Sequence, residues 1–201
     1  MNDSRPLISG VVNITPDSFS DGGLYLAPEK ALAHARNLLA SGADAVELGA
    51  ASSNPDAAPV SSAEELRRLS PVLVQLKQEG CPIAVDSTQP EVQRFALEQG
   101  VRYLNDIRGF PDPGMHPLLA ASDCRLVVMH SVTHGIQAER VAKTPMEVYG
   151  SIRHFFEQRI GQLISAGVDR NRRDRVYGLD ERRMAAGDSL RPTAADLHHQ
   201  S

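Results

Sequence analysis

The sequence predicts an α/β fold in which parallel strands alternate with helices. Short apolar runs recur along the chain, and several lack the in-and-out alternation of a half-exposed antiparallel strand. Such runs are typical of parallel strands that are covered on both faces. We expect these strands at residues 7–13, 44–49, 82–86, 101–106 and 124–129. Repeated strand-then-helix order requires right-handed crossovers, and it fits either an open doubly wound sheet or a closed barrel.

Start and stop signals mark the helices between these strands. Ser61 and Glu64 form a capping box before one apolar stripe, and Thr144 and Glu147 form another before the last stripe. Glycines close three of the patterns, and a glycine is the usual residue just beyond a helix end. The expected helices are 28–41, a helix beginning at Ser61, 90–99, a short one near 114–121, and 144–166.

Composition restricts the class of protein. The 201 residues are 41% hydrophobic with a net charge of −4, which suits one domain with one core. Aromatic residues make up only 4% and no basic excess is present, so a nucleic-acid partner is not expected. No apolar run approaches membrane-spanning length and no cleavage site follows the start, which predicts a cytoplasmic protein without a membrane partner. Cys81 and Cys124 lack any metal-binding spacing, so we expect buried reduced thiols and no zinc.

Polar residues gather where the expected strands end. Asn13, Asp86, Asn105 and His130 each close an apolar run. In an α/β barrel the reacting groups lie at these strand ends. Each residue also has a structural interpretation: Asp86 as a helix cap, Asn105 as a turn former, and His130 as a group bonded to nearby backbone. The remaining histidines have no partner spacing and are expected at the surface: His34, His116, His134 and His154.

A loop of unusual density follows the first strand. Residues 13–23 read N-I-T-P-D-S-F-S-D-G-G, which resembles the signature of dihydropteroate synthases without a gap. Further matching segments follow in family order at 49–55, 85–87, 104–107 and 128–130, so that the resemblance covers roughly residues 7–170. Ala51, Ser53 and Asn54 stand where the family usually has Glu, Thr and Arg. This departure is similar to the sulfonamide-resistance branch of the family.

The resemblance implies a TIM-type (β/α)8 barrel and a specific reaction. Diphosphate is displaced from 6-hydroxymethyl-7,8-dihydropterin diphosphate by the amine of p-aminobenzoate, giving 7,8-dihydropteroate in folate biosynthesis. Asp86 and Asn105 would bind the pterin and Met129 would pack on its ring, while Asn13 would be a ligand of Mg²⁺ on the diphosphate. The substrate loops would contain Thr15, Asp17, Ser18, Phe19, Ser52, Ser53 and Asn54. The implied partners are these two small molecules, and full-length family members form homodimers.

The sequence departs from the family pattern near its end. Residues 1–169 are expected to form a partial pterin-binding barrel of about five βα units. Residues 170–201 are arginine-rich and lack the family's D-P-G-x-G-F and S-R-K-S motifs, so we expect no further strand after Gly167. The abrupt change near Arg172 is what a reading-frame slip would produce, with a genuine solvated tail as the alternative.

Two other functions stay open at this stage. One is an inactive fragment of the same enzyme, because the sequence does not decide whether this 201-residue form turns over. The other is a pterin-dependent methyltransferase barrel, which shares the Asp and Asn contacts to pterin. The loop at 15–23 argues against the methyltransferase.

Overall fold

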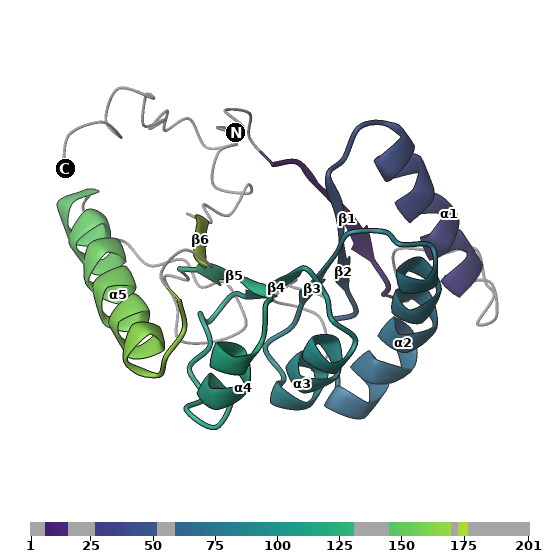
Figure 1. The fold of residues 1–201 in the computed structure, drawn as a ribbon. Helices are drawn as coiled ribbons and strands as arrows, with labels where there is room; N and C mark the ends of the chain where they lie inside the picture. Colours follow the sequence, from purple (N-terminus) through teal and green to yellow (C-terminus); the bar gives the residue numbers. More distant parts are fainter. Residues whose placement is uncertain (1–6, 16–26, 52–58, 131–144, 170–172, 177–201) are drawn as a thin grey trace.

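The protein forms one parallel sheet with helices along one side of it (Figure 1). The computed structural model describes residues 7–15, 27–51, 59–130, 145–169 and 173–176. The strands are β1 (Ser9–Asn13), β2 (Ala45–Gly49), β3 (Ile83–Asp86), β4 (Tyr103–Asp106), β5 (Arg125–Met129) and β6 (Arg173–Val176). The helices are α1 (Ala27–Ala40), α2 (Ser62–Gln78), α3 (Pro90–Glu98), α4 (His116–Ala121) and α5 (Pro145–Ser165).

The strands lie side by side in chain order, and each neighbouring pair is parallel. The five strands and five helices expected from the sequence are confirmed. Figure 1 shows the helices following one another around the outside of the curved sheet, from α1 to α5. This arrangement leaves the opposite, inner face of the sheet free of these helices.

Strand β6 contradicts the expectation that no strand follows Gly167. It pairs with β5 in a parallel register that matches Leu126 with Arg173 and Met129 with Val176. Its sequence, R-D-R-V, has no apolar run that would mark a buried strand. The main-chain donors and acceptors along β5 can pair with an added strand whatever its side chains are, and for that reason side-chain pattern alone misses it.

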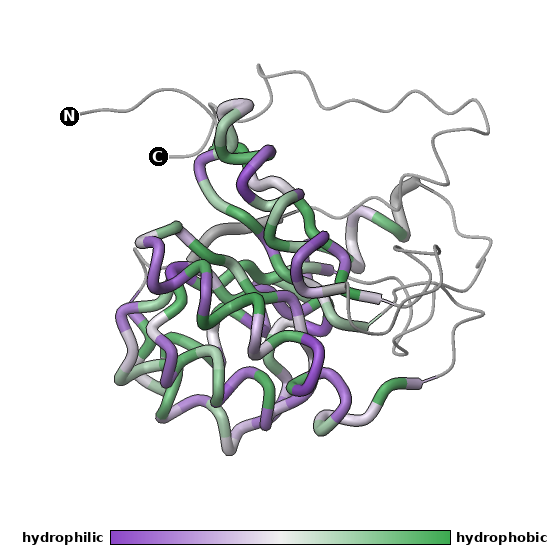
Figure 2. Tube along the Cα trace, turned by 90° about the vertical axis from the view of Figure 1, so that its right-hand side faces the viewer, coloured by the Kyte–Doolittle hydropathy of each residue, from purple (hydrophilic) through white to green (hydrophobic). Residues whose placement is uncertain are grey.

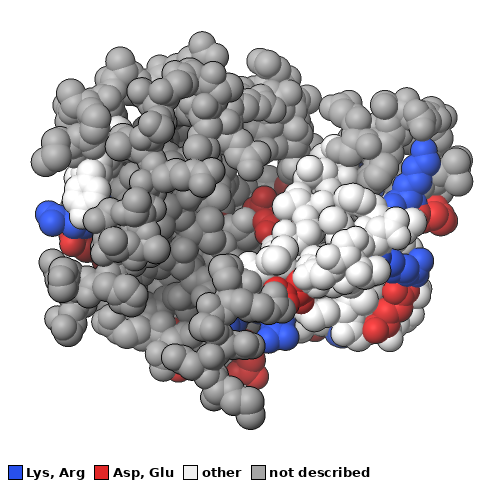
Figure 3. Space-filling view, turned by 90° about the horizontal axis from the view of Figure 1, so that it is seen from above, with Lys and Arg blue, Asp and Glu red and all other residues white. Residues whose placement is uncertain are grey.

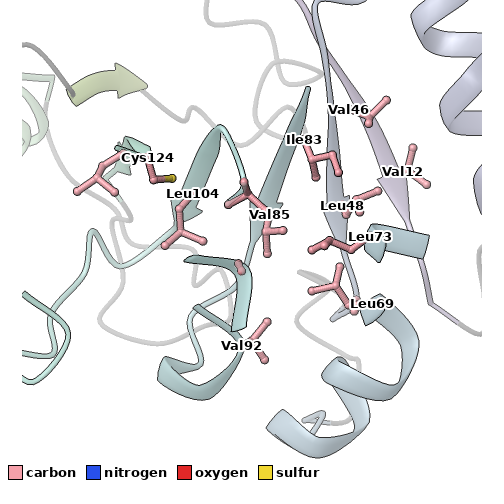
Figure 4. Close-up of a cluster of buried hydrophobic side chains, with 14 of the residues drawn as sticks. Val12, Val46, Leu48, Leu69, Leu73, Ile83, Val85, Val92, Leu104 and Cys124 are labelled. Carbon is pink, nitrogen blue, oxygen red and sulfur yellow. The ribbon is translucent and has the colours of Figure 1, made fainter. Parts of the chain in front are cut away.

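The core lies between the sheet and the helices. Strand residues that face outward are apolar and buried, such as Val12, Leu48, Val85 and Leu104, and they belong to one cluster with helix residues such as Leu69 of α2 (Figure 4). Packing is close at Gly10, where an added Cβ would lie 2.9 Å from the Cβ of Leu38. Along the helices, hydrophobic and hydrophilic stretches alternate, as expected for helices with one buried face (Figure 2).

Helix ends follow the sequence signals in part. The Ser61 Oγ accepts a hydrogen bond from the Glu64 amide at 3.3 Å, which confirms that Ser61 caps α2. The Glu64 carboxylate does not return the bond, because it accepts instead from Arg67 at 2.6 Å and from Arg68 at 2.7 Å. Gly42, Gly100 and Gly167 all adopt positive φ just beyond a helix, as expected. The proposed cap at Thr144 lies outside the described residues.

Surface charges on the described residues occur in small mixed groups. In the view from above, acidic and basic side chains neighbour each other on the described surface (Figure 3). One such pair joins α1 to the end of α2, with the Arg36 Nη2 lying 2.6 Å from the Glu79 Oε1. None of the helices within the described ranges is both long and apolar enough to span a bilayer.

The predictions for the cysteines and for the histidines have different outcomes. Cys124 is buried and Cys81 is half-buried, and both are free thiols. His34 and His154 are exposed as expected, whereas His116 is buried, so its prediction is wrong. The His116 Nε2 lies 3.1 Å from the Phe110 carbonyl oxygen. A helix of only six residues has no apolar stripe that would reveal which of its polar residues face inward.

Candidate active site

The inner face of the sheet carries a row of polar residues at the carboxyl ends of the strands. Strand register aligns Asn13 with Gly49, Gly49 with Asp86, Asp86 with Asn105, and Asn105 with Val127. Successive residues of a strand point to opposite faces, so members of one row share a face. The structure therefore brings together three of the predicted site residues, Asn13, Asp86 and Asn105.

A second row lies on the same face, two residues before the first row along each strand. Its aligned members are Val11, Glu47, Ala84, Tyr103 and Arg125. Ala84 and Tyr103 are buried and contact each other in a small apolar cluster with Ala45, separate from the main core. This apolar cluster lies next to the polar row, on the side away from the carboxyl ends of the strands.

Asp86 is a carboxylate in an unfavourable electrostatic setting. Among the described residues, none donates a hydrogen bond to it. Burial raises the pKa of the Asp86 carboxyl to about 7, and the negative charges of Glu47, Asp106 and Glu65 add to this effect. Near neutral pH, Asp86 therefore exchanges readily between its protonated and ionised forms. A ligand that brings N–H donors would favour the ionised form.

Asn105 lies beside Asp86 with one side of its amide already used. Its Nδ2 donates to the Glu47 Oε1 at 2.9 Å. Its Oδ1 is buried and accepts no hydrogen bond from any residue that the structure describes. A buried acceptor without a donor is costly, so it marks a position where a ligand or water is expected to bind.

Asn13 ends β1 and its side chain is exposed. Its neighbour in the row, Gly49, has no side chain, and an added Cβ there would lie 3.5 Å from the Asn13 Oδ1. The amide oxygen is therefore uncovered on the side of Gly49. This setting suits a ligand of a hard cation that keeps most of its waters.

A network on the other face of the sheet supports the row from behind. The Gln93 Nε2 donates to the Asp106 Oδ2 at 2.9 Å and to the Ser87 carbonyl at 2.8 Å. The Ser87 Oγ donates to the Glu65 Oε2 at 2.8 Å. These bonds tie the segments that follow β3 and β4 to helices α2 and α3. They hold the ends of the strands that carry Asp86 and Asn105.

The segment after β4 is fixed by a tight turn. The Asp106 carboxylate accepts from the amides of Arg108 at 2.7 Å and Phe110 at 3.1 Å. Gly109 and Phe110 both adopt positive φ, of 69° and 61°. The Phe110 carbonyl is contacted by the ring of His116 and by the Arg159 Nη1. Asp106 is thus a structural residue and not part of the row.

His130 follows β5 and is buried against α5. Its ring lies 5.1 Å from the Phe155 ring in an edge-to-face contact and 6.4 Å from the Phe156 ring. These contacts pack the His130 ring against two aromatic side chains of α5, and they do not test the prediction that it bonds to nearby backbone. Met129, the last residue of β5, is half-buried and pairs with Val176 of β6.

The loop residues of the predicted site are only partly described. Thr15 is buried directly beyond β1. The others lie outside the described residues: Asp17, Ser18, Phe19, Ser52, Ser53 and Asn54. Within the described ranges, no group of three His, Cys, Asp or Glu side chains could hold a metal ion.

Three residues that the structure links to this site were missed by the sequence analysis. Glu47 lies in the middle of an apolar strand, where it resembled a simple interruption. Glu65 and Gln93 lie within amphipathic helices and look like ordinary polar residues. The available signal was the position of Glu65 and Gln93 on the apolar side of their helical patterns. A polar residue at such a position is expected to be buried and therefore to need a hydrogen-bond partner.

Known proteins with similar sequences support the resemblance. Residues 9–173 match the family model described as pterin binding enzyme. Dihydropteroate synthase type-2 of Escherichia coli is 57% identical over 166 residues, covering 83% of this chain and 61% of that protein. Type-3 of Escherichia coli is 53% identical over 165 residues, covering 82% and 63%. The higher identity to these types than to dihydropteroate synthase of Mycobacterium leprae, at 37%, fits the branch indicated by residues 51–54.

Solved structures agree with the sequences. The dihydropteroate synthase from Clostridium difficile, solved in the presence of pteroic acid, has a TM-score of 0.78 at 36% identity over 90% of this chain and 67% of that chain. The enzyme from Xanthomonas albilineans with 4-aminobenzoic acid has a TM-score of 0.78 at 35% identity, over 88% and 63%. These relatives decide between an open sheet and a barrel: the strands belong to a TIM-type barrel, of which part is present here.

The match has a defined extent. The chain spans about three fifths of the length of the curated relatives it matches. The matched part includes every strand of the sheet up to the first residue of β6, and with them the polar row. On this family match and these identities, the chain belongs to the pterin binding enzyme family.

Proposed function

We propose that the polar row binds a dihydropterin and that the protein is a dihydropteroate synthase. In this reaction 6-hydroxymethyl-7,8-dihydropterin diphosphate condenses with p-aminobenzoate to give 7,8-dihydropteroate. The observation that carries the proposal is a pair of adjacent acceptors, the Asp86 carboxylate and the Asn105 Oδ1, which receive no hydrogen bond from the residues that the structure describes. The names of the relatives and the pteroic acid present with one of them support the same ligand.

The chemistry of a pterin fits these two acceptors. Its ring edge carries several N–H donors close together, and each needs an acceptor once the ring leaves water. Binding would supply Asp86 with hydrogen-bond donors and would lower its pKa from about 7. The ring would then be held at the end of β3 and β4, with Met129 of β5 packing against it.

The other half of the reaction concerns the diphosphate. We assign Asn13 as the protein ligand of an Mg²⁺ ion, because its amide oxygen is exposed and uncovered at the end of β1. Bound Mg²⁺ supplies positive charge that neutralises the leaving diphosphate. Asn13 itself contributes one neutral oxygen and fixes where that charge lies relative to the pterin.

The second substrate would bind against the loops that follow β1 and β2. Thr15 begins the first of these loops, and its buried position directly after Ile14 anchors the segment to the sheet. We propose that the substrate loops contact the substrates through the following residues: Asp17, Ser18, Phe19, Ser52, Ser53 and Asn54. The presence of 4-aminobenzoic acid with the Xanthomonas albilineans relative supports this substrate.

The direct test is calorimetry on the 201-residue chain with 6-hydroxymethylpterin monophosphate. Asp86→Asn should weaken binding by about 10- to 150-fold, because hydrogen bonds to a charged group contribute about 1.5 to 3 kcal/mol. Asp112→Asn is the matched control, because Asp112 is an exposed carboxylate in the segment between β4 and α4. Equal affinity of wild type and Asp86→Asn would remove Asp86 from the site.

Turnover is tested separately with the dihydropterin diphosphate, p-aminobenzoate and Mg²⁺. Formation of dihydropteroate would establish the activity, and Asn13→Ala should lower the rate and weaken its dependence on Mg²⁺ concentration. An unchanged Mg²⁺ titration would contradict the assignment of Asn13. If the chain binds the pterin analogue tightly but forms no product, the synthase activity is rejected and the protein is a pterin-binding protein.

A further inference from the structure

The Asn105 amide is held in one of its two possible orientations. An amide group can turn by half a rotation with almost no change of shape, exchanging its oxygen and nitrogen. In this protein the Nδ2 points to Glu47 and donates to its Oε1 at 2.9 Å, while the Oδ1 is left buried without a donor among the described residues. Glu47 is half-buried on β2 and lies in the row beneath Asp86 and Asn105.

A carboxylate can only accept hydrogen bonds, and this property makes the orientation unequal. In the reversed orientation, the Oδ1 of Asn105 would meet the Glu47 Oε1, so two acceptors would face each other without a proton between them. The bond at 2.9 Å would be lost and replaced by repulsion inside a partly buried site. Glu47 therefore determines that the acceptor side of Asn105 is the side left for a ligand.

We propose that Glu47 is a positioning residue that fixes the Asn105 amide so that its Oδ1 and the Asp86 carboxylate present two neighbouring acceptors to the ligand. The proposal rests on the proposed pterin site, and it specifies why that site takes a ring with adjacent N–H donors. Asp86 and Asn105 are register partners on adjoining strands, so their acceptors are spaced by one strand separation. A planar heterocycle with neighbouring N–H groups matches such a pair.

Glu47 has a second effect that its hydrogen bond does not explain. The groups whose charges act on Asp86 are Glu47 of β2, Asp106 of β4 and Glu65 of α2, in that order after burial itself. The charge of Glu47 therefore keeps Asp86 protonated to a higher pH than burial alone would. A variant that keeps the bond to Asn105 but removes this charge separates the two effects.

The experiment compares Glu47→Gln and Glu47→Ala with wild type, using the full 201-residue chain. Glutamine has the same shape as glutamate, and its Oε1 can still accept from the Asn105 Nδ2. Its amide can also turn and donate to the Asn105 Oδ1, so both orientations of Asn105 are then allowed, and a ligand that selects one of two equal orientations loses only about twofold in affinity. Without ligand, NMR of the Asn105 side-chain amide should show a hydrogen-bonded, slowly exchanging signal in wild type and Glu47→Gln. In Glu47→Ala that signal should exchange faster and move toward the position of a solvated amide.

Binding of 6-hydroxymethylpterin monophosphate supplies the second readout. At pH 8, Glu47→Ala should bind about 3- to 30-fold more weakly than wild type, whereas Glu47→Gln should stay within about twofold. At pH 6, Glu47→Gln should bind more tightly than wild type, because Asp86 without the neighbouring charge ionises at lower pH. The pH profile reports the charge of Glu47, whereas the difference in affinity between Glu47→Ala and Glu47→Gln at pH 8 reports its hydrogen bond to Asn105.

The outcomes separate this proposal from the proposed function. If Glu47→Ala leaves both the amide signal and the affinity unchanged, or if Glu47→Gln loses as much affinity as Glu47→Ala with the wild-type pH profile, the positioning role is rejected. If wild type does not bind the pterin analogue, the proposed function fails, and the ligand-free amide signal alone decides whether Glu47 orients Asn105. Thermal unfolding of each variant shows whether any loss reflects unfolding.

Discussion

Asp86 and Asp106 end neighbouring strands of the same sheet, yet they have opposite surroundings. Asp106 is 1% exposed and accepts three hydrogen bonds, from Gln93 and from the amides of Arg108 and Phe110. Asp86 receives none from the residues that the structure describes, and nearby carboxylates oppose its ionisation. The difference follows from register, because Asp86 aligns with Asn105 and so faces inward, whereas Asp106 is one residue further and faces the helices.

In this contrast, one carboxylate serves the fold, and the other is the one that we propose binds the ligand. Burial raises the pKa of both carboxyls, but at Asp106 the hydrogen bonds counteract that effect within the protein itself. At Asp86 none of the described residues supplies such hydrogen bonds, and we propose that a ligand does. Sites that retain such uncompensated groups lower stability in exchange for binding. The comparison therefore predicts opposite effects when each carboxylate is replaced.

Replacing Asp106 should produce the largest loss of stability. Asp106→Ala leaves the Gln93 amide and two backbone amides without their acceptor in a buried setting, so we expect a loss of about 3 to 5 kcal/mol in the free energy of unfolding. Urea unfolding measures this loss. The control is Asp112→Ala, where an exposed carboxylate accepts only from the Gly114 amide at 2.8 Å, and we expect a loss below about 1 kcal/mol. Similar losses in the two variants would show that the buried network is not what stabilises this turn.

The turn that Asp106 anchors should be sensitive at Gly109 as well. Gly109 has a φ of 69°, and an added Cβ would lie 3.0 Å from the Phe155 Cζ and 3.1 Å from the Val128 Cγ1. Gly109→Ala should therefore cost about 2 to 3 kcal/mol, which combines backbone strain with overpacking.

Gly80→Ala is the matched control for this variant. Its φ of 73° imposes the same kind of strain, but no atom lies within 4 Å of the added Cβ. The expected cost is about 1 kcal/mol. Chemical denaturation of both proteins isolates the contribution of the contact with α5, and an equal cost at both glycines would contradict it.

Much of this site could be predicted from the sequence because it is encoded locally. Asp86 and Asn105 close apolar runs, and the segment at 13–23 carries a long ungapped motif, so both the strand ends and the family could be inferred. The different roles of Asn105 and Asp106 also follow from the alternation of side chains along a strand. Local pattern was sufficient wherever the role of a residue depends on its own strand.

The remaining features depend on contacts between distant segments. Glu47 acquires its role only because register places it within reach of Asn105, 58 residues later in the chain. His116 is buried where its Nε2 contacts the Phe110 carbonyl oxygen, six residues earlier. The six-residue helix α4 has no apolar periodicity that would predict this burial. Strand β6 forms through main-chain pairing with β5 and has no apolar signal. No periodicity within a single segment carries such information.

The effect expected at Asp86 has the opposite sign to the others, and it tests the comparison most directly. The pKa of Asp86 is about 7 in the folded protein and near its ordinary value of 3.8 in the unfolded chain. Between these values the folded state binds more protons than the unfolded state, so the contribution of Asp86 to stability falls as the pH rises through this window. Asp86→Asn cannot ionise, so it should be about as stable as wild type at pH 4 and more stable at pH 8, by up to about 4 kcal/mol, because the two pKa values differ by about 3 and each unit corresponds to about 1.4 kcal/mol. Glu65 and Asp106 also have raised pKa values, so the quantity to measure is the difference between variant and wild type in urea unfolding across this pH range. A difference that does not change between pH 4 and pH 8 would show that Asp86 finds donors in the free protein and is compensated in the same way as Asp106.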